Sequence, residues 1–460
     1  MVYVLCMTSP DLIDLVLFER ILQTAASPSS MDQLCRKHNL KVRRGIYGLA
    51  VVVWLMIYQR LHSKGTLSAA VQMLARQAVH WQEQPHCGKR VREGRISTRT
   101  GGDCQARQKM PTLVASHVCD HIFEQLQVQM REAMPAGPGP VFVIDGTTLR
   151  LPHERELGKA FPPGRNQHGE NHWPTMLLVA FHDVHSGLGM RPSWGAMYGQ
   201  RAVGEQELAR QALQRLPADA MVLADGNFGI FAFAYAVQQT QRPLLFRLTA
   251  ARAHKVLGDQ GLRPGRRRQV AWEASGWDRQ MHPELPVGAR VQGWMVACRN
   301  PARKEEILYF FTTLDRKPRR ILALYKLRWH IETDLRSLKR TLDLHQITSK
   351  SKDLVEKEVL MAVCAYNVVR AVIYLSASRA GLAPRQLSFS TAQDAVMAAW
   401  PDLQRAHAGA AFQQELERLL RVVAQAKLPE RRRKRSYPRA VWGRGGQFPS
   451  RRSARPEVRG

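Results

Sequence analysis

The sequence has few acidic residues for its size, and its cysteines form no recognisable site. Only 38 of the 460 residues are Asp or Glu, against 68 Lys or Arg, so the net charge is +30. The seven cysteines are an odd number and are scattered, with no C-x-x-C pair. This pattern argues against a disulfide framework and a zinc ribbon, and it predicts free thiols in a reducing compartment.

Motifs of several other protein classes are also absent. There is no P-loop and no G-x-S-x-G turn, so ATP dependence is unsupported. The first residues lack the basic region of a signal peptide, and neither end carries a lipidation motif. The most apolar runs, 46–61 and 359–375, are too short or too interrupted to span a bilayer. We therefore expect a soluble cytoplasmic protein that does not bind a membrane.

What the chain does contain is an apolar core and a large excess of positive charge. Hydrophobic residues make up 45% of it, which indicates a globular protein of about two or three structural units. The charge predicts a polyanionic partner, and nucleic acid is the commonest one. The pattern of residues 1–130 predicts a helical unit. Within it, the basic segment 89–109 is either a contact with a DNA backbone or a solvated linker.

Two short apolar segments are each followed by Asp-Gly. Val141–Ile144 leads into Asp145-Gly146, and Met221–Ala224 leads into Asp225-Gly226. Each pattern predicts a buried strand that delivers a carboxylate at its C-terminal end, where active sites of open α/β sheets commonly lie. For one such Asp alone, a simple turn is the more economical interpretation.

The third acidic position lies on a predicted helix over 321–342, which has no internal Gly or Pro. At about 100° per residue, six apolar residues fall in one arc that must face a core: Leu324, Leu327, Ile331, Leu335, Leu338 and Leu342. Tyr325, Arg328, Glu332 and Lys339 fall in a second arc about 60° wide beside the first. Ordinary surface charges on an amphipathic helix are the alternative, but a carboxylate grouped with these cations favours phosphate chemistry.

Three carboxylates from two strands and a helix suit a pair of hard divalent cations. Two such ions activate an attacking water or hydroxyl and stabilise the leaving oxygen at phosphorus, while Arg and Lys hold the phosphates. No His or Cys set has zinc spacing, and we interpret the pairs His168/His172 and His182/His185 as surface or core histidines.

The spacing Tyr325-x2-Arg328-x3-Glu332-x6-Lys339 resembles the Y-R-E-K signature of DDE transposases of bacterial insertion sequences, specifically the insertion-sequence-four family. Asp145-Gly146-Thr147 and Asp225-Gly226-Asn227-Phe228 stand where that family has its first and second Asp. The resemblance continues at 104–111, 365–367 and 387–389, and it covers about residues 100–440.

This resemblance implies an α/β fold: an RNase H-like catalytic domain with a mixed sheet flanked by helices, interrupted by a β-rich insertion between Asp225 and Glu332, which are 107 positions apart. It implies that Asp145, Asp225 and Glu332 are catalytic and bind two Mg²⁺ ions, with Mn²⁺ as an alternative. It also implies that Tyr325, Arg328 and Lys339 contact DNA phosphates. Some relatives hold a flipped base with a Trp of the insertion. The candidates here are Trp272, Trp277 and Trp294.

The resemblance predicts a bacterial, nucleoid-associated enzyme that cleaves the ends of its own insertion sequence and transfers the strands into target DNA. Its partners would be double-stranded DNA, as terminal inverted repeats and target, and a second copy of the chain. An inactive DNA-binding regulator and a metal-dependent nuclease without strand transfer remain the alternatives. The expected layout is an N-terminal helical DNA-binding region (1–130), catalytic core (131–250), β-rich insertion (251–317), catalytic core with the signature helix (318–378), helical region (379–427) and disordered basic tail (428–460).

Overall fold

The protein is described by a computed structural model, in which residues 1–426 form one compact unit and 427–460 a second. The described residues are 28–41, 45–62, 65–77, 93, 95–132, 139–166, 169–258, 261–301, 305–406 and 409–429. Parts of the basic segment 89–109, His168 and almost all of the predicted basic tail lie outside these residues.

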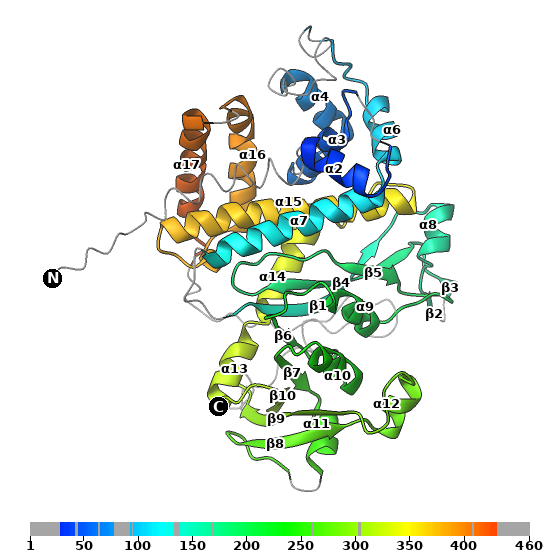
Figure 1. The fold of residues 1–460 in the computed structure, drawn as a ribbon, viewed down its shortest axis with the longest axis vertical. Coiled ribbons are helices and arrows are strands. Elements are labelled where there is room, and N and C mark those ends of the chain that lie inside the picture. The colour runs from blue at the N-terminus through cyan, green and yellow to red at the C-terminus, as the bar shows by residue number, and fades with distance from the viewer. Residues whose placement is uncertain are drawn as a thin grey trace, which may run out of the picture. The chain divides into compact units, whose positions relative to one another are not determined.

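A mixed sheet lies at the centre of the first unit (Figure 1). In order across the sheet, its eight strands in the described chain are β5 (Ser193–Ala196), β4 (Thr175–Asp183), β1 (Val141–Arg150), β6 (Met221–Ala224), β7 (Leu244–Leu248), β10 (Ile307–Thr312), β9 (Arg290–Arg299) and β8 (Arg267–Glu273). The central strands β1, β6 and β7 are parallel, and every other pairing is antiparallel. A separate small hairpin joins β2 (Arg165–Asn166) and β3 (Gly169–Glu170).

Three strands lie in the region where a β-rich insertion is expected, and they extend the central sheet. Strand β10 pairs with β7, and β9 and β8 follow outward to the edge. Two short helices, α11 (Ala250–Leu257) and α12 (Gly276–Met281), belong to the same region. The apolar β10, whose Phe310 and Phe311 are fully buried, continues the core past the last parallel strand.

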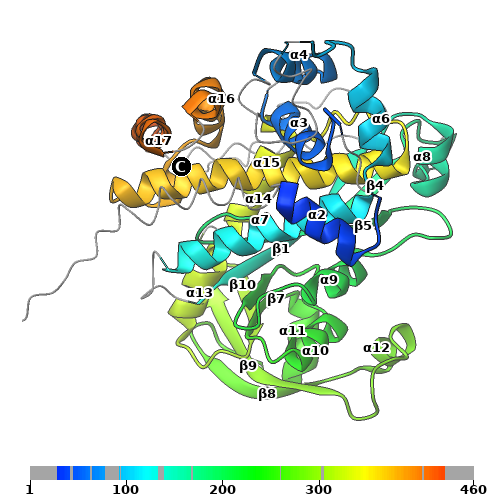
Figure 2. The ribbon, with the colours of Figure 1, turned by 45° about the horizontal axis from the view of Figure 1, so that its top comes forward.

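Helices cover the sheet, and the longest is α15 (Lys352–Arg379). It packs against α7 (Thr112–Glu132), and the two lie side by side in Figures 1 and 2. By length and composition α15 could cross a membrane, but its apolar stretch is wholly buried inside the protein, as in the core helix of a globular domain. The remaining helices are α2 (Pro28–Lys37), α3 (Leu49–Leu61), α4 (Leu67–Gln77), α6 (Gly101–Lys109), α8 (Arg155–Ala160), α9 (Glu205–Leu213), α10 (Phe231–Gln239), α13 (Pro318–Lys326), α14 (Trp329–Arg336), η4 (Pro384–Gln386), α16 (Phe389–Ala406) and α17 (Gly409–Gln425).

The two faces of the sheet belong to two different apolar clusters. On β1, Phe142 and Ile144 join the larger cluster with α7 and α15, whereas Val141 and Val143 join a smaller cluster with α13 and α14. This alternation follows from the two-residue period of a strand. A side chain at 145 therefore points to the face that α13 and α14 cover.

The helix predicted over 321–342 is not continuous. Helix α13 ends at Lys326, α14 begins at Trp329, and a π-helical turn, η3, spans Ser337–Thr341. The junction between α13 and α14 is closed by i→i+3 bonds, for example from Arg328 N–H to the carbonyl of Tyr325. The tight junction and the wider π-helical turn each change the direction in which the following side chains point. As a result, Ile331 and Leu335 pack on one side of the sheet, and Leu338 and Leu342 pack on the other.

Candidate active site

The two predicted aspartates lie at equivalent positions on neighbouring parallel strands. The pairing aligns Val143 of β1 with Leu223 of β6, and the same register two residues on aligns Asp145 with Asp225. Parallel neighbours are about 4.8 Å apart, so the two carboxylates share one edge and one face of the site. Strand β1 was expected to end at Asp145, but it continues to Arg150 because β4 pairs with it along that length.

Burial and neighbouring charge raise the pKa of Asp145. Desolvation is the larger cause, and the charges of Asp225 and Glu205 add to it, so that the pKa rises from 3.8 to about 6. Arg328 and a hydrogen bond from the Gly146 N–H act in the opposite direction. Burial and the neighbouring acids thus outweigh Arg328 and the hydrogen bond, and they favour the protonated form of Asp145.

Glu205 is a carboxylate of this site that the sequence analysis did not single out. It opens α9, and its side chain accepts a hydrogen bond from the Asn227 amide, next to Asp225. It also packs over Gly146, where a Cβ would come within 2.1 Å of Glu205 Oε1. Glu205 thus joins strand β1 at Gly146 to the turn that follows β6, and burial followed by the charge of Asp225 raises its pKa.

The turn that carries Asp225 is held from several directions. Asp225 Oδ1 accepts the Asn227 N–H at 2.9 Å, and the Arg252 guanidinium donates to the carbonyls of Gly226 and Gly229 at 2.7 and 3.2 Å. At Gly229 a Cβ would lie 2.2 Å from the Arg247 carbonyl, so only glycine fits this approach to β7. The sequence D-G-N-F-G is therefore needed for the shape of the turn as well as for its acid.

Helices α13 and α14 bring two signature residues to this face. Tyr325 is buried against Phe310, and its pKa is raised mainly by burial. The Arg328 guanidinium lies 5.9 Å from the Tyr325 ring centre and 5.1 Å from that of Trp329. The charge of Arg328 also lowers the pKa of Asp145, so this cation lies close to the acidic pair.

Glu332 lies one turn further along α14, and Arg328 Nη2 approaches its Oε1 at 3.4 Å. The carboxylate is 39% exposed, so it is open to solvent or to a ligand. Among the described residues, no three His, Cys, Asp or Glu side chains are grouped closely enough to hold a metal ion. The structure thus brings Asp145 and Asp225 together, with Glu332 on the adjacent helix rather than in contact with both.

Lys339, predicted to contact DNA, is turned toward β1. Its Nζ donates to Thr147 Oγ1 at 3.1 Å and to the Thr148 carbonyl at 2.9 Å. It lies in the π-helical turn η3, and these bonds tie that turn to the strand that carries Asp145.

On its far side, α14 is fixed by a buried carboxylate. Asp334 is fully buried and pairs with Arg370 of α15 and with Arg385 of η4, whose Nη2 donates to Asp334 Oδ2 at 2.9 Å. His182 Nδ1 of β4 lies 3.8 Å from the same oxygen. Burial opposes ionisation of Asp334, but Arg370 and Arg385 outweigh it and lower its pKa to about 2.

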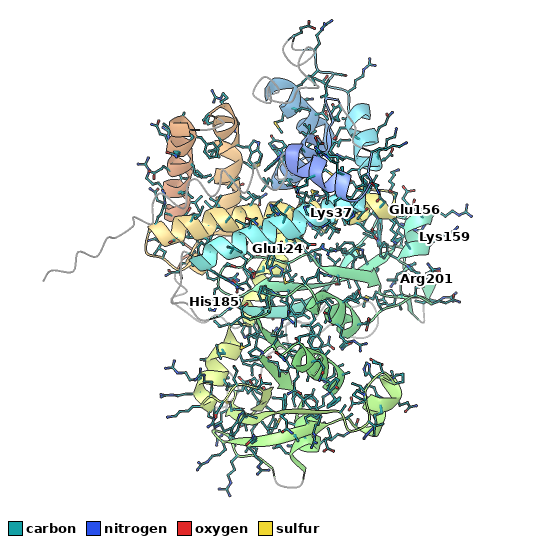
Figure 3. The ribbon with its side chains drawn as sticks, viewed as in Figure 1. Lys37, Glu124, Glu156, Lys159, His185 and Arg201 are labelled. Carbon is teal, nitrogen blue, oxygen red and sulfur yellow. The ribbon has the colours of Figure 1, made fainter. Side chains whose placement is uncertain are left out.

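The histidines and tryptophans named above fall into distinct environments. His172 and His185 are exposed and His182 is buried, as expected for residues outside a zinc site, and His185 lies close to α14 (Figure 3). Trp272 is buried between Phe231 and Phe311, so it is a core residue without a free face for a base. Trp277 is 59% exposed, and Trp294 lies under the Arg267 guanidinium.

The chemistry of the acidic pair fits a hard divalent cation. Its donors are carboxylate oxygens, and the pKa of Asp145 is raised by burial first and then by the charges of Asp225 and Glu205, so a bound cation would favour its ionised form. Asp145, Asp225 and Glu332 could hold such ions, with Glu332 approaching from α14.

Comparison with known proteins gives two matches. The chain matches the model of a family described as "Transposase DDE domain" over residues 136–368, just over half its length. It is also 28% identical, over 319 residues, to the transposase InsG for insertion sequence element IS4 of Escherichia coli (strain K12). That similarity covers 67% of this chain and 69% of the other protein. The family match includes all three predicted acids and the whole signature from Tyr325 to Lys339.

Proposed function

Because this chain belongs to the family of DDE transposases, which cleave DNA and transfer its strands, we propose that Asp145, Asp225 and Glu332 are its catalytic carboxylates. The single observation that best supports this assignment is the register of β1 and β6, which sets Asp145 beside Asp225 beneath the helices that carry Arg328 and Glu332.

The proposed cofactor is Mg²⁺, as two ions, with Mn²⁺ as an alternative. When bound, such ions activate the attacking water or 3′-hydroxyl and stabilise the leaving oxygen at phosphorus. The chain's own part is to keep the carboxylates ready for the ions. Asp145 must lose its proton, and Glu205 keeps the turn at Asn227 against strand β1 at Gly146.

Tyr325, Arg328 and Lys339 are the proposed DNA contacts near the end of the element. The case for Arg328 is the strongest of the three, since its guanidinium already lies beside Asp145 and can form charge-assisted hydrogen bonds with a phosphate. Lys339 would exchange its bonds to Thr147 and Thr148 for a phosphate oxygen, and Tyr325 would offer only its hydroxyl because its ring is packed.

The proposed substrates are the terminal inverted repeats of the element and then target DNA. Hydrolysis frees a 3′-hydroxyl at each end, and transesterification joins it to the target. Two ends have to be joined in one event, so we propose a homodimer in the DNA complex. The enzyme would act in the bacterial cytoplasm, at the nucleoid, where its DNA is.

The test is metal-dependent cleavage of DNA that carries the gene's own flanking sequences, with wild type compared with Glu332→Ala. Wild type should cut at the element boundary in Mg²⁺, and the variant should bind the same DNA without cutting it. Glu273→Ala, an exposed acid on the edge strand β8, is the matched control and should cut like wild type.

Each other result has a definite meaning. Normal cutting by Glu332→Ala would remove that residue from the catalytic set. Binding without cutting by wild type would favour the regulator, and cutting at scattered sites without strand transfer would favour the nuclease. The family match favours neither of these alternatives.

A further inference from the structure

The outer side of α13 is a row of positive charge. Arg319, Arg320 and Lys326 are exposed on this helix, and Arg316 and Lys317 are exposed immediately before it. Within the part of the chain that the structure describes, none of these five forms an ion pair with an acidic side chain. A surface this basic is available to an anion.

The electrostatics of the helix strengthen that conclusion. The N-terminal end of a helix carries a partial positive charge, which favours acids and disfavours cations. Here the first turn contains no acidic residue, and the N-cap Lys317 makes no capping hydrogen bond with its side chain. Cations placed at this end repel the helix dipole in the free protein, and a bound phosphate would relieve that repulsion.

A cavity of about 650 Å³ opens beside the row. Leu324 and Leu327 of α13 form its apolar part, and Arg267 of β8 stands on the opposite side, with its guanidinium 4.4 Å from the Trp294 ring centre. The remaining lining residues are Asp315, Arg316, Lys317, Arg320 and Ala323. The sequence had assigned Leu324 and Leu327 to the core, but in the structure they are only half-buried.

A second large cavity of the described chain lacks this character. It has a volume of about 430 Å³ and combines Glu156 and Glu356 with Lys159, Arg201 and Lys352. In Figure 3, Glu156, Lys159 and Arg201 gather around α8, far along the sheet from α13. Its three cations face two acids, whereas the cavity beside α13 has four cations and one acid, so the cavity beside α13 is the better site for a polyanion.

The direction of α13 connects the row to the chemistry. The helix runs from Arg319 toward Arg328, which lies beside Asp145. At 1.5 Å per residue these nine positions span about 14 Å, and phosphates follow one another along a DNA strand at about 3.4 Å of helix axis. The row therefore covers the length of about four base pairs along a duplex axis.

We propose that α13 and the adjacent basic cavity bind the backbone of the DNA duplex on one side of the scissile phosphate, along about four base pairs that lead to Arg328. The inference rests on the proposed function, and it adds where the duplex lies outside the active site. The contacts are to phosphates, so they position the duplex without reading its sequence.

The first test measures the salt dependence of DNA binding by Arg319→Gln/Arg320→Gln. Each phosphate that the protein no longer neutralises should flatten the log–log slope by about 0.9, so the slope of the double variant should fall by close to 2 units and its binding should be about tenfold weaker near 0.1 M salt. Arg418→Gln/Arg421→Gln on α17 removes the same charge from exposed positions and should keep the wild-type slope. An unchanged slope in the α13 variant, or an equal loss in the control, would overturn the proposal.

The second test uses boundary duplexes shortened in single base-pair steps from either side of the cleavage point. Removing about four base pairs on one side should flatten the wild-type slope, while the α13 variant should already be insensitive to that change. Wild-type cleavage of the full duplex tests the proposed function separately. If wild type cleaves the full duplex but both proteins respond equally to shortening, the proposed function stands and only the proposed DNA contact of α13 is rejected.

Discussion

At the scale of single residues, the contact of Glu205 with Gly146 and Asn227 connects a strand and a turn that are far apart in sequence. The contact needs a glycine at 146, because any side chain there would overlap the Glu205 carboxylate. Asp145 and Asp225 could be predicted from sequence because an apolar strand followed by Asp-Gly is a local pattern. Glu205 could not, since its partners are brought to it only by the pairing of β1 with β6.

Glu205→Gln should weaken metal activation while leaving the fold intact. The amide keeps an acceptor for Asn227 but removes a negative charge beside Asp145 and Asp225. Residues that support metal ligands in this way typically contribute 10- to 100-fold in metal affinity. We expect the Mn²⁺ concentration for half-maximal cleavage to rise about tenfold, with Glu207→Gln on the same helix as control. An unchanged Mn²⁺ requirement would make Glu205 a purely structural residue.

Asp145→Asn should stabilise the metal-free protein, and only above acidic pH. The folded pKa of Asp145 is about 6 against 3.8 for an ordinary Asp, so the folded state favours the protonated form. The protonated Asp145 carboxyl therefore contributes its full stabilisation of the folded state below about pH 4, and this stabilisation is lost as the pH rises through 6. We expect about 2 kcal/mol higher unfolding free energy for the variant at pH 8 and no difference at pH 3.5, measured by urea titration with chelator.

Asp394→Asn, an exposed change on α16, should be neutral at both pH values. A stabilisation of Asp145→Asn that did not depend on pH would contradict the carboxylate explanation.

At the scale of elements, α14 is held between its exposed Glu332 and its buried Asp334. Asp334→Asn should cost about 3 kcal/mol, because Arg370 and Arg385 would stay buried without their counter-charge. Denaturant unfolding measures the cost, and Asp402→Asn, which removes an exposed pair with Arg405, should cost less than about 1 kcal/mol. Equal costs for the two variants would show that the buried pairs do not fix α14.

The same helices show where sequence periodicity stops being informative. A single period of 3.6 residues assigned Ile331 and the leucines from Leu324 onward to one face, and it gave the right burial for Ile331, Leu335, Leu338 and Leu342. It missed the junction after Lys326 and the π-helical turn at Lys339, because both depend on contacts with β1 and β10 rather than on local propensity. The strands were easier, since each has a compact apolar run.

At the scale of the whole molecule, the N-terminal helices share one core with the catalytic part. Val118, Ile122 and Phe123 of α7 belong to the same buried cluster as Val359 and Val363 of α15. The α/β class and the three strands of the insertion could be predicted from sequence. The packing of α7 on α15 could not, because two apolar helices do not indicate their partners. The predicted boundary at residue 130 stays a prediction.

Removing residues 1–132 should therefore leave a poorly packed protein. The apolar face of α15 would lose its cover, so the fragment 133–460 should aggregate or bind a hydrophobic dye and show no cooperative thermal transition. The fragment 1–426, which corresponds to one compact unit, should keep the wild-type transition. A cooperative 133–460 fragment would show that the catalytic part folds independently.

The central position of α15 also has a consequence for synthesis on the ribosome. This helix is encoded after all three acidic residues, yet it covers the sheet that bears two of them. A nascent chain that has released β1, β6 and α14 still lacks the helix against which the sheet packs. A message that ended by premature termination before codon 352 would thus give a product with all three proposed catalytic carboxylates but no closed core, which would be degraded rather than compete with the full-length enzyme.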